Sequence, residues 1–269
     1  MSLVDQLISA RVYDLGQPYF VGMPHFPTHP PFLYSLTKMH GDLVLKNGAS
    51  AAAEAITLGG HVGTHIDALC HFSCGGRFYG GVEAETIQSV DHGFTELGIA
   101  TVAPIVRRAW LFDVAGWMGL DVLPHDFVVT PELFDMMATA QELRVSAGDV
   151  ALIRTGWGSL WRDHRAFITA GLHEQATSPG PELAGAKWLS ARGVYAAGSD
   201  TVAFERLPAA EMPVHVHLLV ESGIHIIECL NLEELARDQV REFGFVASPM
   251  KIEGGTGAPV RPLALVESR

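Results

Sequence analysis

Cysteine is scarce in this sequence. Its 269 residues include only Cys70, Cys74 and Cys229, which are too few and too unevenly spaced for a disulfide framework. A structural zinc site built on Cys70 and Cys74 would need a second cysteine pair, and the sequence has none. Because disulfides persist mainly in oxidising compartments, the low cysteine content favours a protein of the reducing cytoplasm.

Positive charge is also in short supply. Lysine and arginine number 18 against 30 aspartate and glutamate residues, so the formal net charge is −12. Nucleic acids and anionic membrane surfaces are bound through basic patches, and the charge therefore disfavours both partners and suits a small-molecule substrate. No uncharged run approaches the roughly 20 residues of a membrane helix, and the first residues do not resemble a signal peptide. We expect a cytoplasmic protein.

The sequence also lacks internal repeats, low-complexity tracts and long polar linkers, so we expect one domain over residues 1–269. Apolar and β-branched stretches predict strands at 109–114, 149–158, 194–200 and 224–230, with two more within 243–266. Helical periodicity predicts helices at 130–145, 179–193 and 213–223, the first with Thr130 as N-cap and the second with Pro181 at its start. This alternation predicts an α/β domain with a mixed sheet.

Residues 18–32, PYFVGMPHFPTHPPF, contain five prolines and two histidines. Proline fixes φ and cannot extend a helix, so this segment is predicted to be an ordered extended loop. Its aromatic rings could line a pocket, or they could pack against one another as a surface strap. The composition of the segment does not decide between these two roles.

The most informative stretch is HVGTHIDALCHF, residues 61–72. A helix would place His61 and His65 on one face but would turn Asp67 away from them. A flat strand would put all three on one face but would separate the histidines by about 13 Å, too far for one ion. A bend between the histidines resolves the conflict, and Gly63 permits one. The spacing predicts a kinked strand or a strand-to-turn transition.

Two imidazoles and one carboxylate suit an open site for Zn²⁺, Mn²⁺ or Fe²⁺. His71 follows in the same stretch and could take and return a proton during hydrolysis. The alternative is that these histidines pack in a core and bind nothing. Further ligand-type side chains lie in HVHLLVESGIHIIE, namely His215, His217, His225 and Glu228.

The motif HVGTHIDALCHF resembles the signature of the metal-dependent cyclase/hydrolase family, which includes bacterial kynurenine formamidases and isatin hydrolases. The resemblance extends over later blocks, among them GDVALIRTGWG and GGTGAPVRP, and covers about 14–262. It implies a swivelling β/β/α fold around a barrel-like mixed sheet. Many members have proline in the slot that Leu69 occupies here, and leucine at this position is more similar to the isatin-hydrolase and general cyclase side of the family than to the kynurenine formamidases.

By this resemblance the metal ligands would be His61, His65, Asp67, His215 and Glu228. His71 would be the general acid/base, and His217 is a rival to His215, because the segment can be slid by two residues. The resemblance also gives residues of the N-terminal loop a role in lining the substrate pocket: Phe20, His25, Phe26 and Phe32.

The activity implied is metal-dependent hydrolysis of an amide bond in an aryl formamide or a cyclic amide, with Mn²⁺ or Zn²⁺ as cofactor and a homodimer or homotetramer as the assembly. A binding protein that holds its ligand through the metal without turnover is the alternative. The presence of His71 speaks against a pure binder, because binding alone has no need of a proton shuttle.

Overall fold

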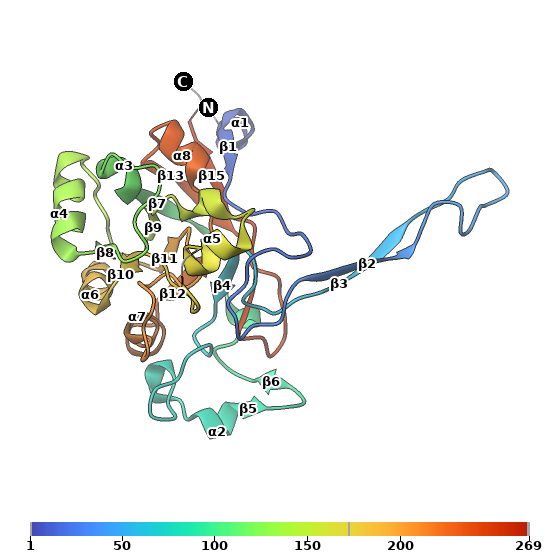
Figure 1. The fold of residues 1–269 in the computed structure, drawn as a ribbon, viewed down its shortest axis with the longest axis horizontal. Coiled ribbons are helices and arrows are strands. Elements are labelled where there is room, and N and C mark those ends of the chain that lie inside the picture. The colour runs from blue at the N-terminus through green and yellow to red at the C-terminus, as the bar shows by residue number, and fades with distance from the viewer. Residues whose placement is uncertain (1, 172, 268–269) are drawn as a thin grey trace.

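A nine-stranded mixed sheet forms the centre of the protein in the computed structural model, which describes residues 2–171 and 173–267 (Figure 1). Its middle consists of four parallel strands: β7 (Ile105–Asp113), β9 (Val150–Arg154), β11 (Ala196–Ser199) and β12 (His225–Glu228). Antiparallel strands extend the sheet beyond β7 and beyond β12: β13 (Glu242–Ala247), β15 (Leu263–Val266) and β1 (Arg11–Asp14) on one side, and β4 (His65–Asp67) and β14 (Gly257–Pro259) on the other. The α/β class with a mixed, curled central sheet is thus confirmed.

Alternate side chains of the central strands enter two different cores. In β7, Ala109 and Leu111 belong to one buried cluster, while Trp110 and Phe112 belong to the other. Successive strand residues point to opposite faces of a sheet, so both faces of β7 are buried over residues 109–112. This explains why the parallel strands read as continuous apolar runs rather than as alternating patterns.

Helices cover one face of the sheet, where α4 (Pro131–Ala140), α6 (Leu183–Ala191) and α7 (Pro213–His215) lie near one another (Figure 1). As predicted, Thr130 caps α4, and its hydroxyl accepts a hydrogen bond from the amide of Leu133. The position of Pro181 was predicted wrongly. It lies in β10 (Gly180–Pro181), which pairs with β8 (Val128–Val129), and Glu182 is the N-cap of α6.

Other predicted elements also differ from the structure. The helix expected at 130–145 ends at Ala140, and the stretch 243–266 contains β14 in addition to the two expected strands. The strand expected at 109–114 begins four residues earlier, at Ile105, because the whole stretch pairs with β13, and Val114 already starts α3 (Val114–Trp117). The helix expected at 213–223 continues from α7 as a π-helix, Val216–Glu221. The remaining short elements are α1 (Leu3–Ser9), α2 (Ala84–Ile87), α5 (His164–Thr169), α8 (Glu233–Arg237), β5 (Gln88–Ser89), β6 (Gly93–Phe94) and 3₁₀ turns at Tyr79–Gly81, Ile99–Thr101 and Trp157–Leu160.

The proline-rich segment 18–32 is an ordered loop without helix or strand, as predicted. Its start is fixed to the body, because the indole N–H of Trp161 donates to the carbonyl of Pro18. Met23 and Phe32 are buried in a third apolar cluster. The loop leads directly into β2 (Leu33–Lys38), which pairs with β3 (Ala53–Thr57) in a ribbon that projects from the body (Figure 1).

Across the described part of the chain, no helix has both the length and the apolar character needed to cross a lipid bilayer.

Candidate metal centre

Strand pairing brings the first three ligand-type side chains together. His65 and Asp67 lie two positions apart on β4 and therefore share a face of the sheet. In the antiparallel pairing of β4 with β12, Glu228 lies directly opposite His65. His65 Nε2 is 3.3 Å from Glu228 Oε2 and 3.5 Å from Asp67 Oδ1, while its Nδ1 faces the carbonyl of Gly63 at 2.8 Å. The sheet register thus aims Nε2 at both carboxylates.

His61 reaches the same place from the turn before β4. Gly63 has a φ of +71°, which confirms the predicted bend between the two histidines. His61 Nδ1 then lies 2.7 Å from Asp67 Oδ1, and its Nε2 lies 2.8 Å from the hydroxyl of Thr256. The bend places side chains that are six residues apart within hydrogen-bond distance of each other.

The bend also requires that residue 63 has no side chain. A Cβ there would lie 2.5 Å from the ring of Tyr19, whose hydroxyl is held 3.0 Å and 2.9 Å from the carbonyl oxygens of Val62 and Thr64. We expect Gly63→Ala to destabilise the protein by about 2–4 kcal/mol, from positive-φ strain and steric overlap together. Chemical denaturation would measure the change in the free energy of unfolding.

Gly119 provides a matched control for this prediction. It also has a φ of +71°, but a Cβ there would meet no atom within 4 Å. Gly119→Ala should therefore show only the backbone strain, about 1–2 kcal/mol. Equal losses in the two variants would show that Tyr19 does not restrict residue 63.

His215 completes the cluster from the opposite side. Its Nε2 lies 3.3 Å from Glu228 Oε1 and 3.9 Å from Asp67 Oδ2. Its Nδ1 lies 2.5 Å from Glu205 Oε1, and the backbone amides of Val214 and His215 donate to the same carboxylate. Glu205, which is 1% exposed, thus fixes the His215 ring with Nε2 toward the cluster. Sequence reasoning missed Glu205, because it lies in an irregular loop with no recognisable spacing to the motif.

The charges in this cluster fit a bound cation. Burial would lower the pKa of His215, but the adjacent carboxylates of Glu205 and Glu228 outweigh burial and raise the pKa to about 10. Burial likewise opposes ionisation of Asp67, yet the surrounding histidines hold its pKa below the usual range. Asp67 Oδ2 and Glu228 Oε1 are buried and have no hydrogen-bond partner among the described residues. Buried carboxylate oxygens of this kind call for a positive charge, so the set can hold a divalent cation.

His71 lies beside the cluster. Its ring stacks on that of His61, with 3.8 Å between the centroids and an interplanar angle of 23°. Burial lowers the pKa of His71 to about 3, with the neighbouring His61 and His215 acting in the same direction. A ligand atom of His71 also falls within 4.8 Å of those of His61 and Asp67, so geometry permits both a proton-transfer role and direct ligation.

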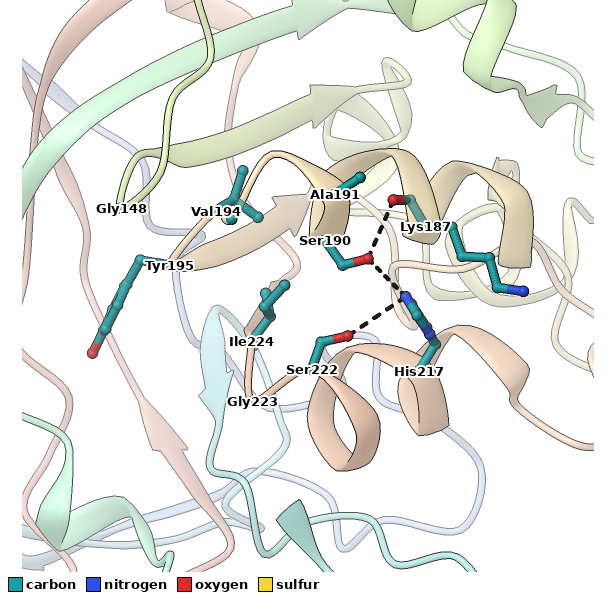
Figure 2. A pocket seen from close by; sticks show the side chains of 11 residues that line it. Gly148, Lys187, Ser190, Ala191, Val194, Tyr195, His217, Ser222, Gly223 and Ile224 are labelled. Carbon is teal, nitrogen blue, oxygen red and sulfur yellow. Dashed lines mark hydrogen bonds between the residues drawn. The ribbon is translucent and has the colours of Figure 1, made fainter. Parts of the chain in front are cut away.

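The geometry decides between His215 and His217 as the metal ligand from this segment. The His217 ring lies in a surface groove of about 710 Å³ between α6 and the π-helix, with Ser190 and Ser222 beside it (Figure 2). Its Nε2 is 2.8 Å from Ser190 Oγ and its Nδ1 is 2.6 Å from Glu221 Oε2. Only His215, of these two, reaches the buried carboxylates.

The N-terminal loop approaches the cluster through His29, which sequence reasoning missed. Its ring centroid lies 5.4 Å from that of His61 and 5.7 Å from that of Phe26. Of the other proposed pocket residues, Phe20 lies under the guanidinium of Arg162, and His25 packs edge-on against His164. Phe32 is buried against Tyr19 in the third cluster. Of the four proposed lining residues, Phe26 is therefore the one whose ring contacts His29, which in turn contacts His61 of the cluster.

The cysteines do not add to the site. Cys70, Cys74 and Cys229 are all free thiols. Burial raises the pKa of Cys70 to about 12, so its reactive thiolate form is suppressed at neutral pH. This fits a small buried apolar side chain better than a nucleophile.

The chain is similar to several known proteins. A family described as "Putative cyclase" matches residues 13–206. An isatin hydrolase of Roseibium aggregatum is 30% identical over 219 residues, which cover 78% of this chain and 73% of that protein. A kynurenine formamidase of Bacillus cytotoxicus is 24% identical over 253 residues, 93% and 95% of the two chains. The crystal structure of a novel cyclase, 28% identical, superposes with a TM-score of 0.86 over 97% of this chain and 89% of that one.

Proposed function

The chain belongs to the putative cyclase family, and from this premise we propose that it is a metal-dependent hydrolase that cleaves a carbon–nitrogen amide bond. The observation that carries the proposal is a pair of buried carboxylate oxygens, Asp67 Oδ2 and Glu228 Oε1, which accept no hydrogen bond among the described residues and both lie within 4 Å of His215 Nε2. The names of two relatives, an isatin hydrolase and a kynurenine formamidase, support an amide substrate. We propose a cyclic amide or an aryl formamide.

His61, His65, Asp67, His215 and Glu228 would hold the ion, with Glu205 orienting His215. Nitrogen and carboxylate ligands suit both Mn²⁺ and Zn²⁺. A bound divalent cation supplies Lewis-acid polarisation of a carbonyl and a more acidic water. Asp67 and Glu228 are buried on β4 and β12, so the rigid sheet rather than a loop fixes their positions.

His71 is the proposed proton carrier. Hydrolysis adds water across the amide: the oxygen joins the carbonyl carbon, the carbon–nitrogen bond breaks, and one proton must travel from the water to the leaving nitrogen. Neutral His71 can accept that proton and return it to the nitrogen. Phe26 and His29 present aromatic rings beside the cluster, and these would pack against the flat ring of an aryl substrate.

The proposal is tested by assaying the protein against isatins, aryl formamides and aryl lactones, after chelation and after addition of Mn²⁺ or Zn²⁺. We expect hydrolysis of at least one amide class, loss of turnover after chelation, and recovery when metal is added. Elemental analysis of protein purified without added metal would identify the ion. Tight, metal-dependent binding of these compounds without turnover would contradict the proposed hydrolase activity and would indicate a binding protein.

A further inference from the structure

The hydroxyl of Thr64 lies where three segments of the chain meet. Thr64 is 0% exposed. Its Oγ1 accepts a hydrogen bond from the backbone amide of Gln17 at 2.8 Å and donates one to the backbone carbonyl of Cys229 at 2.6 Å. One hydroxyl thus joins the start of the N-terminal loop, the turn before β4 and the residue after β12.

Both strands that this hydroxyl joins carry a proposed metal ligand at the adjoining position. Thr64 directly precedes His65, and Cys229 directly follows Glu228. His65 and Glu228 form the last pair in the antiparallel register of β4 with β12. Continuing that register would place residue 64 opposite residue 229. The Thr64 hydroxyl therefore connects the two strands one position beyond their last backbone pair.

The backbone of β12 turns away from β4 at this position. Cys229 has a φ of +54°, a left-handed conformation that residues with a Cβ seldom adopt. Its amide donates to the carbonyl of Thr201 at 3.0 Å, while its carbonyl accepts from Thr64. The position of Glu228 relative to β4 thus depends on a side-chain hydrogen bond at the strand end.

Thr64 is itself held firmly by its neighbours. The hydroxyl of Tyr19 lies 2.9 Å from its carbonyl oxygen, and the amide of Val260 donates to the same oxygen at 3.1 Å. Gln17, whose amide donates to the Thr64 hydroxyl, is also buried, and its Nε2 donates to the carbonyl of Gly158 at 3.0 Å. The hydroxyl is therefore a fixed point against which the end of β12 can be aligned.

We propose that Thr64 is a positioning residue for the metal centre, and that its hydroxyl fixes the separation of His65 and Glu228. The inference rests on the proposed metal-dependent function. A hydroxyl can accept and donate at the same time. Valine has nearly the shape of threonine but would leave a buried amide and a buried carbonyl without partners. Because metal–ligand distances tolerate deviations of only about 0.2 Å, a small shift of β12 would weaken ion binding.

Chelator competition, starting from the metal-loaded protein, tests this role by measuring the dissociation constant of Mn²⁺ or Zn²⁺. Thr64→Val should raise that constant by about 10-fold or more, as loss of a group that orients a ligand typically does. Thr64→Ala removes the hydroxyl without placing a methyl group against the amide and the carbonyl. It should weaken binding in the same direction, even where Thr64→Val folds poorly. Thr64→Ser keeps the hydroxyl and should bind metal nearly as tightly as the wild type.

Thr155→Val is the matched control. Thr155 is also 0% exposed, and its hydroxyl likewise accepts from a backbone amide, that of Trp157 at 3.3 Å, and donates to an oxygen, Asp200 Oδ1 at 2.7 Å. This variant should lose stability in chemical denaturation but keep the metal affinity of the wild type.

Equal weakening of metal binding by Thr64→Val and Thr155→Val would reveal a general effect of stability and would overturn the inference. Wild-type affinity in Thr64→Val and Thr64→Ala would overturn it too, as would a loss in Thr64→Ser as large as that in Thr64→Val. In each of these cases the proposed hydrolase function would stand. A wild-type protein that binds no ion would overturn both.

Discussion

Replacing His71 by alanine should lower kcat by about 10²–10⁴-fold, the usual contribution of a positioned general acid/base. The metal content of the purified variant should remain that of the wild type, because in our proposal His71 moves a proton and does not hold the ion. Steady-state kinetics on the amide substrate and elemental analysis of the same preparation would measure both quantities. KM should change little compared with kcat.

His217→Ala is a suitable control for the His71 variant. His217 lies in a surface groove and bonds to Ser190 and Glu221, so its loss should leave kcat near the wild-type value. Loss of metal from His71→Ala would instead assign His71 as a ligand, which its position near His61 and Asp67 also permits. Near-normal kcat with metal retained would exclude any catalytic role for His71.

Asp67→Ala should abolish metal binding, and with it turnover. A carboxylate oxygen of Asp67 lies within 4 Å of a ring nitrogen of each of the three proposed histidine ligands, His61, His65 and His215. Asp67 is therefore the carboxylate that contacts all three. The readout that does not depend on activity is thermal stability. Metal at 100 times its dissociation constant should stabilise the wild-type protein by about 2.7 kcal/mol, and it should not raise the melting temperature of the variant.

Glu205→Gln should weaken metal binding less than Asp67→Ala does. Glu205 touches the proposed ligand His215 rather than the ion, and loss of such a support typically weakens metal affinity by about 10–100-fold. The variant should still bind metal in calorimetry, but more weakly. If Asp67→Ala bound metal as tightly as Glu205→Gln, Asp67 would not be a ligand.

Local sequence rules predicted the parts of the site that lie close together in the chain. The spacing of His61, Gly63 and Asp67 required a bend, and the structure has it, with positive φ at the glycine. Thr130 was predicted as an N-cap from its position before a periodic apolar run, and it caps α4. Such features depend on the backbone within a few residues, where steric and hydrogen-bonding rules are strong.

Features set by tertiary structure were not predictable in the same way. Glu205 and His29 acquire their positions from contacts with residues 10 and 32 positions away, and no periodicity marks them. The choice between His215 and His217 depended on where one short helical segment lies against the sheet. The exposed apolar face of the β2–β3 ribbon was equally hidden, because alternating apolar residues do not by themselves show whether a core lies beneath them. The prediction of a single domain over 1–269 and that of a cytoplasmic location stay predictions.

The pairing of His65 with Glu228 across β4 and β12 has a consequence for the order of assembly. Residues 65 and 228 are joined only when two strands from opposite ends of the chain lie side by side, and contacts of such long sequence separation form slowly. A nascent chain would therefore present His65 of β4 long before its carboxylate partner, Glu228, leaves the ribosome. A one-residue slip of β12 would turn Glu228 to the opposite face. The proposed ion needs ligands from both strands. Only chains that have aligned β4 and β12 correctly would therefore retain it.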